Sequence, residues 1–313
     1  MTDITPQMVK LLREKSGAGM MDCKKALTEV NGDIEEAVTW LRKKGLAAAA
    51  KKSGRVASEG LVGVAQSGDL KTGCVIEVNS ETDFIAKNDQ FQKMVSFAAA
   101  TALSGDFDED SLLVQKYEGA ESATIGDEIT RLIAVIGENM QFRRLHKLSV
   151  NNGVVATYVH GAVTPGLGSI GVAVALESSA DQQELLVLGK KIAMHIAATQ
   201  PISLCIEEVD PTIVEKEKAI LTEQAKASGR SDDVIKKMVE GRIDKFYKES
   251  VLLEQEFVMD PKLRVKDLIS EFSKTHNTPL ELKAYTRFLL GDGIEKEESN
   301  FAEEVKAQAN AGK

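Results

Sequence analysis

The spacing of apolar residues along the chain changes near residue 60. Before that point apolar side chains recur every three or four positions, as at Met8, Val9, Leu11 and Leu12, which predicts amphipathic helices. After it, short segments that alternate with a period of two are interleaved with longer segments of helical period. The pattern predicts the α+β class, with a helical module followed by sheet-containing subdomains.

Residues 1–45 are predicted to form three short helices, with the shape of a ubiquitin-associated module. Asp33 is a favourable residue to begin the third helix, and Gly45 is expected to end it. A module of this size usually binds a partner rather than performing catalysis. The following stretch, residues 46–60, is small and basic, and we interpret it as a linker.

Two later parts of the chain share one plan of two strands, a helix and a terminal strand. They are residues 61–150 and the pair of segments 151–210 and 251–290. The segment Gly73–Ser80 aligns without gaps on Gly171–Ser178, and both are strand-like. We infer two related α/β core subdomains with antiparallel sheets.

Residues 211–250 interrupt the second subdomain and are predicted to form two charged helices, joined near residues 228–231. Because such a hairpin has too thin an apolar seam to fold alone, we expect it to project toward another chain rather than to lie back on its own subdomain. Residues 291–313 are predicted to form a C-terminal module with a polar helix from Asn300 onward.

The loop Thr82–Ile85 lies between a predicted strand and a predicted helix. One interpretation is that Asp83 caps the helix and Phe84 packs back onto it. The other is that Phe84 protrudes toward a partner. The alignment of the two subdomains places Asp83 on Asp181 but Phe84 on Gln182, so the fold does not require the aromatic ring. This difference favours a function for Phe84.

Composition narrows the class of protein. The 313 residues are 43% hydrophobic and 28% charged, which is typical of a globular chain, and the net charge of −9 argues against general nucleic-acid binding. We expect no secretory signal, no membrane span, and hence a cytoplasmic location. Three widely spaced cysteines indicate neither disulfides nor a metal site. No phosphate-loop or nucleophile motif is present, so we expect no cofactor and no covalent catalysis.

The chain resembles the bacterial translation elongation factor Ts family along almost its whole length. The loop matches the family signature Thr-Asp-Phe-Val-Ala-Lys-Asn, with Ile85 in place of valine. Residues 161–169 depart from the pattern by being longer than in the shortest members. The other similar stretches are Ser16–Leu27, His160-Gly161, Met238–Phe246 and Gln255–Asp260.

The resemblance implies a guanine-nucleotide exchange factor for elongation factor Tu, and not an enzyme. Such a factor binds the GDP-bound partner, promotes GDP release, and leaves the nucleotide-free partner to bind GTP, which displaces the factor. The loop of Thr82, Asp83, Phe84 and Ile85 would insert near the partner's magnesium and phosphate-binding site. The resemblance also implies secondary contacts at His160, Gly161, Lys24 and Lys25. Lys52, in the basic linker, is a further candidate contact because of its charge.

Two other functions stay open on the sequence alone. Glu81 and Asp83 could serve a metal-dependent enzyme as an acid–base pair or as metal ligands. Alternatively, residues 1–45 could act by themselves as an adaptor. The resemblance also implies that two copies can pair through the helical hairpin, as a homodimer or as a complex of two factors with two partners.

Overall fold

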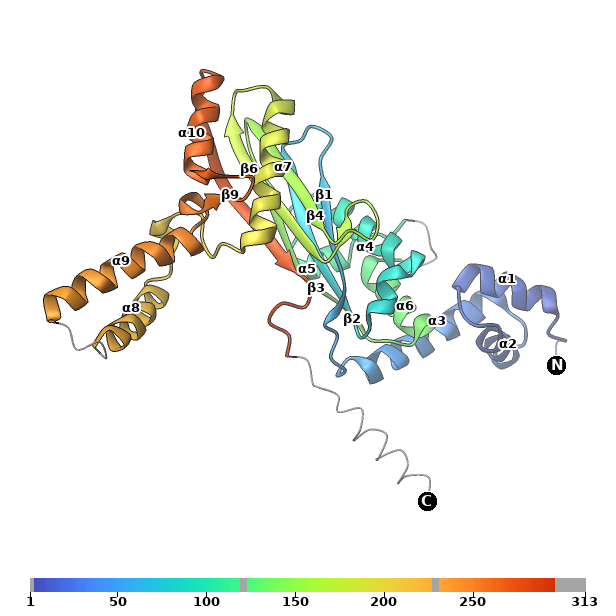
Figure 1. The fold of residues 1–313 in the computed structure, drawn as a ribbon. Helices are drawn as coiled ribbons and strands as arrows, with labels where there is room; N and C mark the ends of the chain where they lie inside the picture. Colours follow the sequence, from blue (N-terminus) through green and yellow to red (C-terminus); the bar gives the residue numbers. More distant parts are fainter. Residues whose placement is uncertain (1–2, 119–122, 227–230, 296–313) are drawn as a thin grey trace.

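The computed structural model describes residues 3–118, 123–226 and 231–295, and Figure 1 shows their arrangement. The expected polar helix from Asn300 onward lies outside the described residues, as does most of the 228–231 joint of the hairpin. The N-terminal module consists of three helices around a small apolar core. They are α1 (Pro6–Ser16), α2 (Met20–Glu29) and α3 (Ile34–Lys52).

The prediction that Gly45 ends the third helix is wrong. Helix α3 passes through Gly45 and continues to Lys52, so helix covers the first half of the stretch interpreted as a linker. A Cβ at Gly45 would lie 3.3 Å from the Cβ of Ala134 on α6 (Ile125–Ile136). Glycine is therefore placed here for close packing of two helices, and not as a helix terminator.

The first sheet is antiparallel, with strand order β3-β2-β1-β5. Helices α4 (Asp89–Ala102) and α6 pack on one face of it, around the buried residues Phe91, Met94 and Leu132. A short helix, α5 (Glu109–Leu113), lies between them in sequence. The strands are β1 (Glu59–Gln66), β2 (Thr72–Ser80), β3 (Met140–Ser149) and β5 (Leu167–Gly168).

The second sheet is also antiparallel, with strand order β4-β6-β9. Helices α7 (Gln182–Thr199) and α10 (Val265–Thr275) cover its outer face. The strands are β4 (Gly153–His160), β6 (Ile170–Ser178) and β9 (Leu280–Leu289). A small ribbon of β7 (Glu256–Phe257) and β8 (Asp260–Arg264) precedes α10. The short 3-10 segments are Ile206–Glu208 and Leu252–Glu254.

The two sheets pack against each other through small and β-branched side chains, among them Val62, Val75 and Ala173. Glycine permits the close approach at two equivalent positions. A Cβ at Gly73 would lie 2.7 Å from Val155 Cγ1, and one at Gly171 would lie 2.6 Å from Val62 Cγ1. The glycines that begin the aligned segments therefore serve one purpose in both sheets.

The strands β2 and β6 share a further irregularity. Pairing of β2 with β3 shifts register between Glu77 and Val78, and pairing of β6 with β9 shifts between Ala175 and Leu176. These two sites coincide when the strands are aligned as the sequence suggests. The two strands therefore share the position of an irregularity in pairing as well as the position of a glycine.

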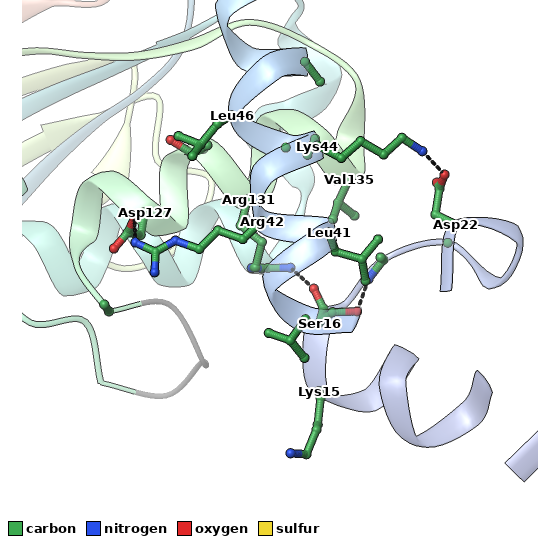
Figure 2. A pocket seen from close by; sticks show the side chains of 18 residues that line it. Lys15, Ser16, Asp22, Leu41, Arg42, Lys44, Leu46, Asp127, Arg131 and Val135 are labelled. Atoms are coloured by element: carbon green, nitrogen blue, oxygen red, sulfur yellow. Dashed lines mark hydrogen bonds and ion pairs between the residues drawn. The ribbon is translucent and has the colours of Figure 1, made fainter. Parts of the chain in front are cut away.

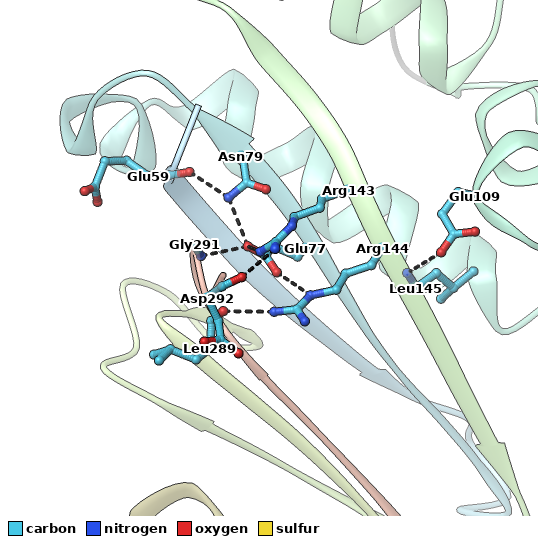
Figure 3. Close-up of polar contacts among 10 residues, drawn as sticks. All are labelled: Glu59, Glu77, Asn79, Glu109, Arg143, Arg144, Leu145, Leu289, Gly291 and Asp292. Atoms are coloured by element: carbon cyan, nitrogen blue, oxygen red, sulfur yellow. Dashed lines mark hydrogen bonds and ion pairs between the residues drawn. The ribbon is translucent and has the colours of Figure 1, made fainter. Parts of the chain in front are cut away.

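A buried carboxylate joins the first sheet to the end of the second (Figure 3). Glu77 is fully buried and accepts hydrogen bonds from Arg143 (3.0 Å), Arg144 (2.6 Å) and the Gly291 amide (2.8 Å). Burial alone would raise the pKa of Glu77, but the Gly291 amide, Asn79 and Arg144 together hold this pKa below its ordinary value. The ionised carboxylate thus fixes the chain after β9 against β2.

The hairpin of α8 (Pro211–Lys226) and α9 (Asp232–Ser250) projects from the second sheet, on the side away from the N-terminal module (Figure 1). Leu221, Ile235 and Ile243 are buried in its seam. Ile213 and Ile220 are exposed, so the arm carries apolar side chains that its own seam does not cover.

Candidate partner-binding site

The loop between β2 and α4 is a short 3-10 helix, Asp83–Lys87. Helix α4 begins after it, and Asn88 caps that helix by accepting hydrogen bonds from the amides of Gln90 (2.9 Å) and Phe91 (3.1 Å). The interpretation of Asp83 as the cap of this helix is therefore wrong. The segment between β2 and α4 is long enough for the helix to begin at either residue. Because the 3-10 helix comes first, the cap lies five residues later in the chain, at Asn88.

The helix that follows β6 shows the alternative. There Asp181 caps α7 directly, accepting from the amides of Gln183 (2.9 Å) and Glu184 (3.1 Å). Residues that form the first turn of α7 thus correspond in the alignment to the 3-10 helix of the first subdomain. The aligned residues therefore form a regular helical turn after β6 and a protruding loop after β2.

Phe84 and Ile85 point in opposite directions. The side chain of Phe84 is 75% exposed, so it does not pack back on α4, whereas Ile85 is 6% exposed and lies in the core of the first subdomain. Asp83 is exposed as well, and no residue that the structure describes donates a hydrogen bond to its carboxylate. The loop therefore presents one aromatic ring and one carboxylate to solvent.

The base of the loop is held by the turn that follows α6. The Glu138 carboxylate accepts hydrogen bonds from the Thr82 amide (3.0 Å) and hydroxyl (2.9 Å). The Glu81 carboxylate accepts from the Asn139 amide and lies 3.5 Å from Arg55. These bonds restrain the backbone immediately before Asp83 and Phe84.

Glu138 and Asn139 were not among the residues singled out from the sequence. They lie more than fifty positions after the loop, and no periodic pattern connects the two stretches. The available signal was local: a polar pair directly after Gly137, which ends α6 in a left-handed conformation (φ 94°), and directly before β3. Polar residues at such a corner frequently bind neighbouring backbone amides.

The predicted secondary residues lie on separate elements. Lys52 is in the last turn of α3, and its Nζ would lie 3.7 Å from a Cβ at Gly137, so it is beside the turn that holds the loop. Lys24 and Lys25 are exposed on α2. Across the described parts of the chain, no hydrogen bond or ion pair joins these two lysines to the loop.

His160 and Gly161 lie at the end of β4, in the other sheet. His160 is exposed, with Nδ1 3.2 Å from the Tyr158 hydroxyl, and its carbonyl accepts a hydrogen bond from the Ser169 amide (3.1 Å). Gly161 has φ 63°, a left-handed conformation that favours glycine. The longer segment after it returns as β5 and pairs with β1 of the first sheet.

An exposed apolar pair on α2 was overlooked at the level of sequence. Met20 is 62% exposed and Met21 is 78% exposed. The helical spacing contained the signal, because Met21 lies three and four positions before Lys24 and Lys25 and so shares their outward face. The N-terminal module thus presents an apolar surface beside two cations.

Neither a metal site nor a membrane-spanning helix accompanies this loop among the described residues. Among residues 3–118, 123–226 and 231–295 no group of three or more histidine, cysteine or acidic residues is placed to hold a metal ion. Within the same ranges, every helix is too short or too polar to cross a membrane.

An exposed aromatic ring on a restrained loop, together with a small helical module, is typical of proteins that bind another macromolecule. The family model described as Elongation factor TS matches residues 81–292. The chain is 55% identical over 308 residues to Elongation factor Ts of Rhodospirillum rubrum, covering 98% of this chain and 99% of that protein.

Further relatives agree. Elongation factor Ts of Parvibaculum lavamentivorans is 55% identical over 309 residues, covering 99% of both chains. That of Rhodospirillum centenum is 52% identical over 309 residues, covering 99% of this chain and 100% of the relative. The chain therefore belongs to the elongation factor Ts family of translation elongation factors, as its resemblance implied.

Proposed function

We propose that this protein is the guanine-nucleotide exchange factor of elongation factor Tu and acts through the loop that presents Phe84. The observation that carries the proposal is the 75% exposure of Phe84 on a restrained loop. Thr82, before Phe84, is hydrogen-bonded to Glu138, and Ile85, after it, is buried. A loop backbone held this way loses little conformational entropy on binding, which is favourable for a residue that anchors an interface.

The four loop residues divide into two roles in this proposal. Thr82 and Ile85 position the loop, because one is bonded to Glu138 and the other is buried in the core. Asp83 and Phe84 are the two that contact the partner. Burying a phenylalanine side chain contributes roughly 1.5–3 kcal/mol, which corresponds to a tenfold to hundredfold change in an equilibrium.

The mechanism follows from linkage. A bound nucleoside diphosphate is held by magnesium and by backbone amides of a phosphate-binding loop. The factor accelerates release when it stabilises the nucleotide-free partner more than the GDP-bound one. Insertion of Phe84 beside the magnesium and phosphate site supplies this difference. The partner conformation that accepts Phe84 is not the conformation that holds magnesium and GDP, so the factor favours the nucleotide-free state.

Secondary contacts give affinity and orientation. On the N-terminal module we assign the outward face of α2, with Met21, Lys24 and Lys25, to the nucleotide-binding domain of the partner. Lys52 extends the contact beside the loop. His160 and Gly161, at the end of β4, are assigned to a distal domain of the partner.

The two competing functions receive less support. Glu81, one of the two acids of the proposed enzyme, is bonded to the Asn139 amide and faces Arg55, so its carboxylate already serves the loop base. An adaptor would act through residues 1–45 alone, which leaves without a role residues 81–292, the part of the chain that the family model matches.

The experiment that tests the proposed function measures reciprocity. The affinity of this protein for elongation factor Tu is determined by calorimetry with the partner nucleotide-free and with saturating GDP. We expect GDP to weaken factor binding by the same factor by which the factor weakens GDP binding, because the coupling free energy is shared. Equal affinities for the two forms of the partner would contradict an exchange role.

A further inference from the structure

One arginine of α6 contacts both the N-terminal module and the helix that follows the Phe84 loop. Arg131 donates through Nη1 to the Ser16 carbonyl (3.4 Å) and through Nη2 to the Gln90 side-chain oxygen (3.2 Å). Ser16 is the last residue of α1. Gln90 lies in the first turn of α4, and its backbone amide donates a hydrogen bond to the side chain of Asn88, the cap of that helix. Arg131 therefore lies where three elements meet.

The orientation of this guanidinium is fixed from its own helix. Glu128, whose residue exposure is 2%, accepts from Arg131 Nε (2.7 Å) and Nη2 (2.7 Å). The hydrogen bonds to Glu128 also raise the pKa of Arg131. A bidentate ion pair of this type defines the plane of the guanidinium, so the remaining N–H groups have a set direction.

The N-terminal module is shaped to accept the arginine. Gly17, which ends α1, has φ 66°, and a Cβ there would lie 2.5 Å from Arg131 Nη1. Glycine thus meets both a backbone requirement and a steric one. The guanidinium also lies at the carboxyl end of an 11-residue helix, where a positive charge is favourable.

A cavity of about 240 Å³ lies beside this junction, between the N-terminal module and α6 (Figure 2). Its lining includes Ser16, Leu41, Arg131 and Val135. Because the two bodies do not fill the space between them, apolar packing leaves part of their contact open. Specific polar contacts, such as those of Arg131, therefore contribute more to fixing the orientation of the N-terminal module relative to α6.

We propose that Arg131 is a positioning residue that holds the N-terminal module in a fixed orientation relative to the Phe84 loop, so that both engage the partner at once. This inference rests on the proposed exchange function. Two binding surfaces held on one rigid frame act at a high effective concentration, and that advantage is lost when one of them can rotate away.

The chain offers a matched control at the same contact. Arg42 on α3 pairs with Asp127 on α6 at 2.7 Å, so it also joins the module to the core. Its side chain is 59% exposed. Unlike Arg131, it makes no hydrogen bond to α4 among the described residues. Arg42→Ala therefore removes one cation and one cross-link without disturbing the junction at Gln90.

The test follows GDP release from elongation factor Tu at increasing concentrations of the full-length factor. We expect Arg131→Ala to raise the half-saturating concentration roughly tenfold, as for loss of charge-assisted hydrogen bonds. The maximal rate should stay within about twofold of wild type, because the loop itself is intact. Arg42→Ala should shift half-saturation by less than about threefold, the range of an exposed pair.

Gln90→Ala provides a second variant that retains the buried ion pair of Arg131, and it should give a smaller shift in the same direction. An unchanged half-saturating concentration in Arg131→Ala would overturn the proposal. So would a lowered maximal rate alone, or a shift equal to that of Arg42→Ala. Failure of the wild-type protein to accelerate release at all would instead reject the exchange function itself.

Discussion

Phe84 shows how far single residues could be interpreted from the sequence. Its lack of a counterpart in the second subdomain indicated that the fold does not need it, and its 75% exposure agrees. Asp83 was harder, because an acid before a helix is a normal cap and the position of the helix start was uncertain by one turn. For Glu138 and Asn139, which restrain the loop, the only signal in the sequence is a polar pair after Gly137, because a long-range contact leaves no periodic pattern that would connect them to the loop.

Glu77 gives a prediction at the scale of one titrating group. Its lowered pKa means that the folded protein binds a proton less readily than the unfolded chain does. Its stabilising contribution is therefore complete above the usual glutamate pKa of about 4.3 and is lost as pH falls through the lower value of the folded state. We expect Glu77→Gln to lower the free energy of unfolding at pH 7 by about 2 kcal/mol.

Urea unfolding across pH 3 to 7 measures this effect, and the difference between wild type and Glu77→Gln should shrink toward the acid end. Glu14→Gln is the control for loss of one negative charge, because Glu14 is exposed on α1. A difference that stays constant over the whole pH range would show that the ionised carboxylate is not the stabilising group.

At the scale of elements, apolar periodicity identified most helices and strands because each buries one face against a sheet or against another helix. It failed at Gly45, where a glycine inside α3 serves helix packing, since a sequence pattern does not distinguish close approach from termination. It also missed that Asp83–Lys87 form a 3-10 helix. There Ile85 is drawn inward and Phe84 is turned out, and the choice depends on the core beneath them.

The two helix caps provide a matched pair. Asn88→Ala and Asp181→Ala each remove a side chain that accepts from two backbone amides, so each should lower the free energy of unfolding by about 1 kcal/mol. Only Asn88 borders the Phe84 loop. We expect only Asn88→Ala to slow stimulated GDP release, by roughly threefold to tenfold, in stopped-flow measurements. Equal slowing by both variants would indicate a general loss of stability.

At the scale of the whole molecule, we propose the division predicted from the sequence, with the hairpin 211–250 as an appendage of the second subdomain. The N-terminal module, the Phe84 loop and the end of β4 are carried by three different units. Their separation matches a factor that holds a large partner at several places while one loop acts on the nucleotide site. The exposed Ile213 and Ile220 offer a surface for pairing two copies, which stays a prediction for sedimentation analysis.

The central claim is that Phe84 drives nucleotide release without supporting the fold. It is tested most directly by stopped-flow release of fluorescent GDP from elongation factor Tu, comparing wild type with Phe84→Ala and with Val114→Ala, an exposed apolar control that is 67% accessible. We predict a tenfold to hundredfold slower stimulated release for Phe84→Ala, unchanged thermal unfolding, and wild-type rates for the control. A Phe84→Ala protein that releases GDP as fast as wild type would contradict the account.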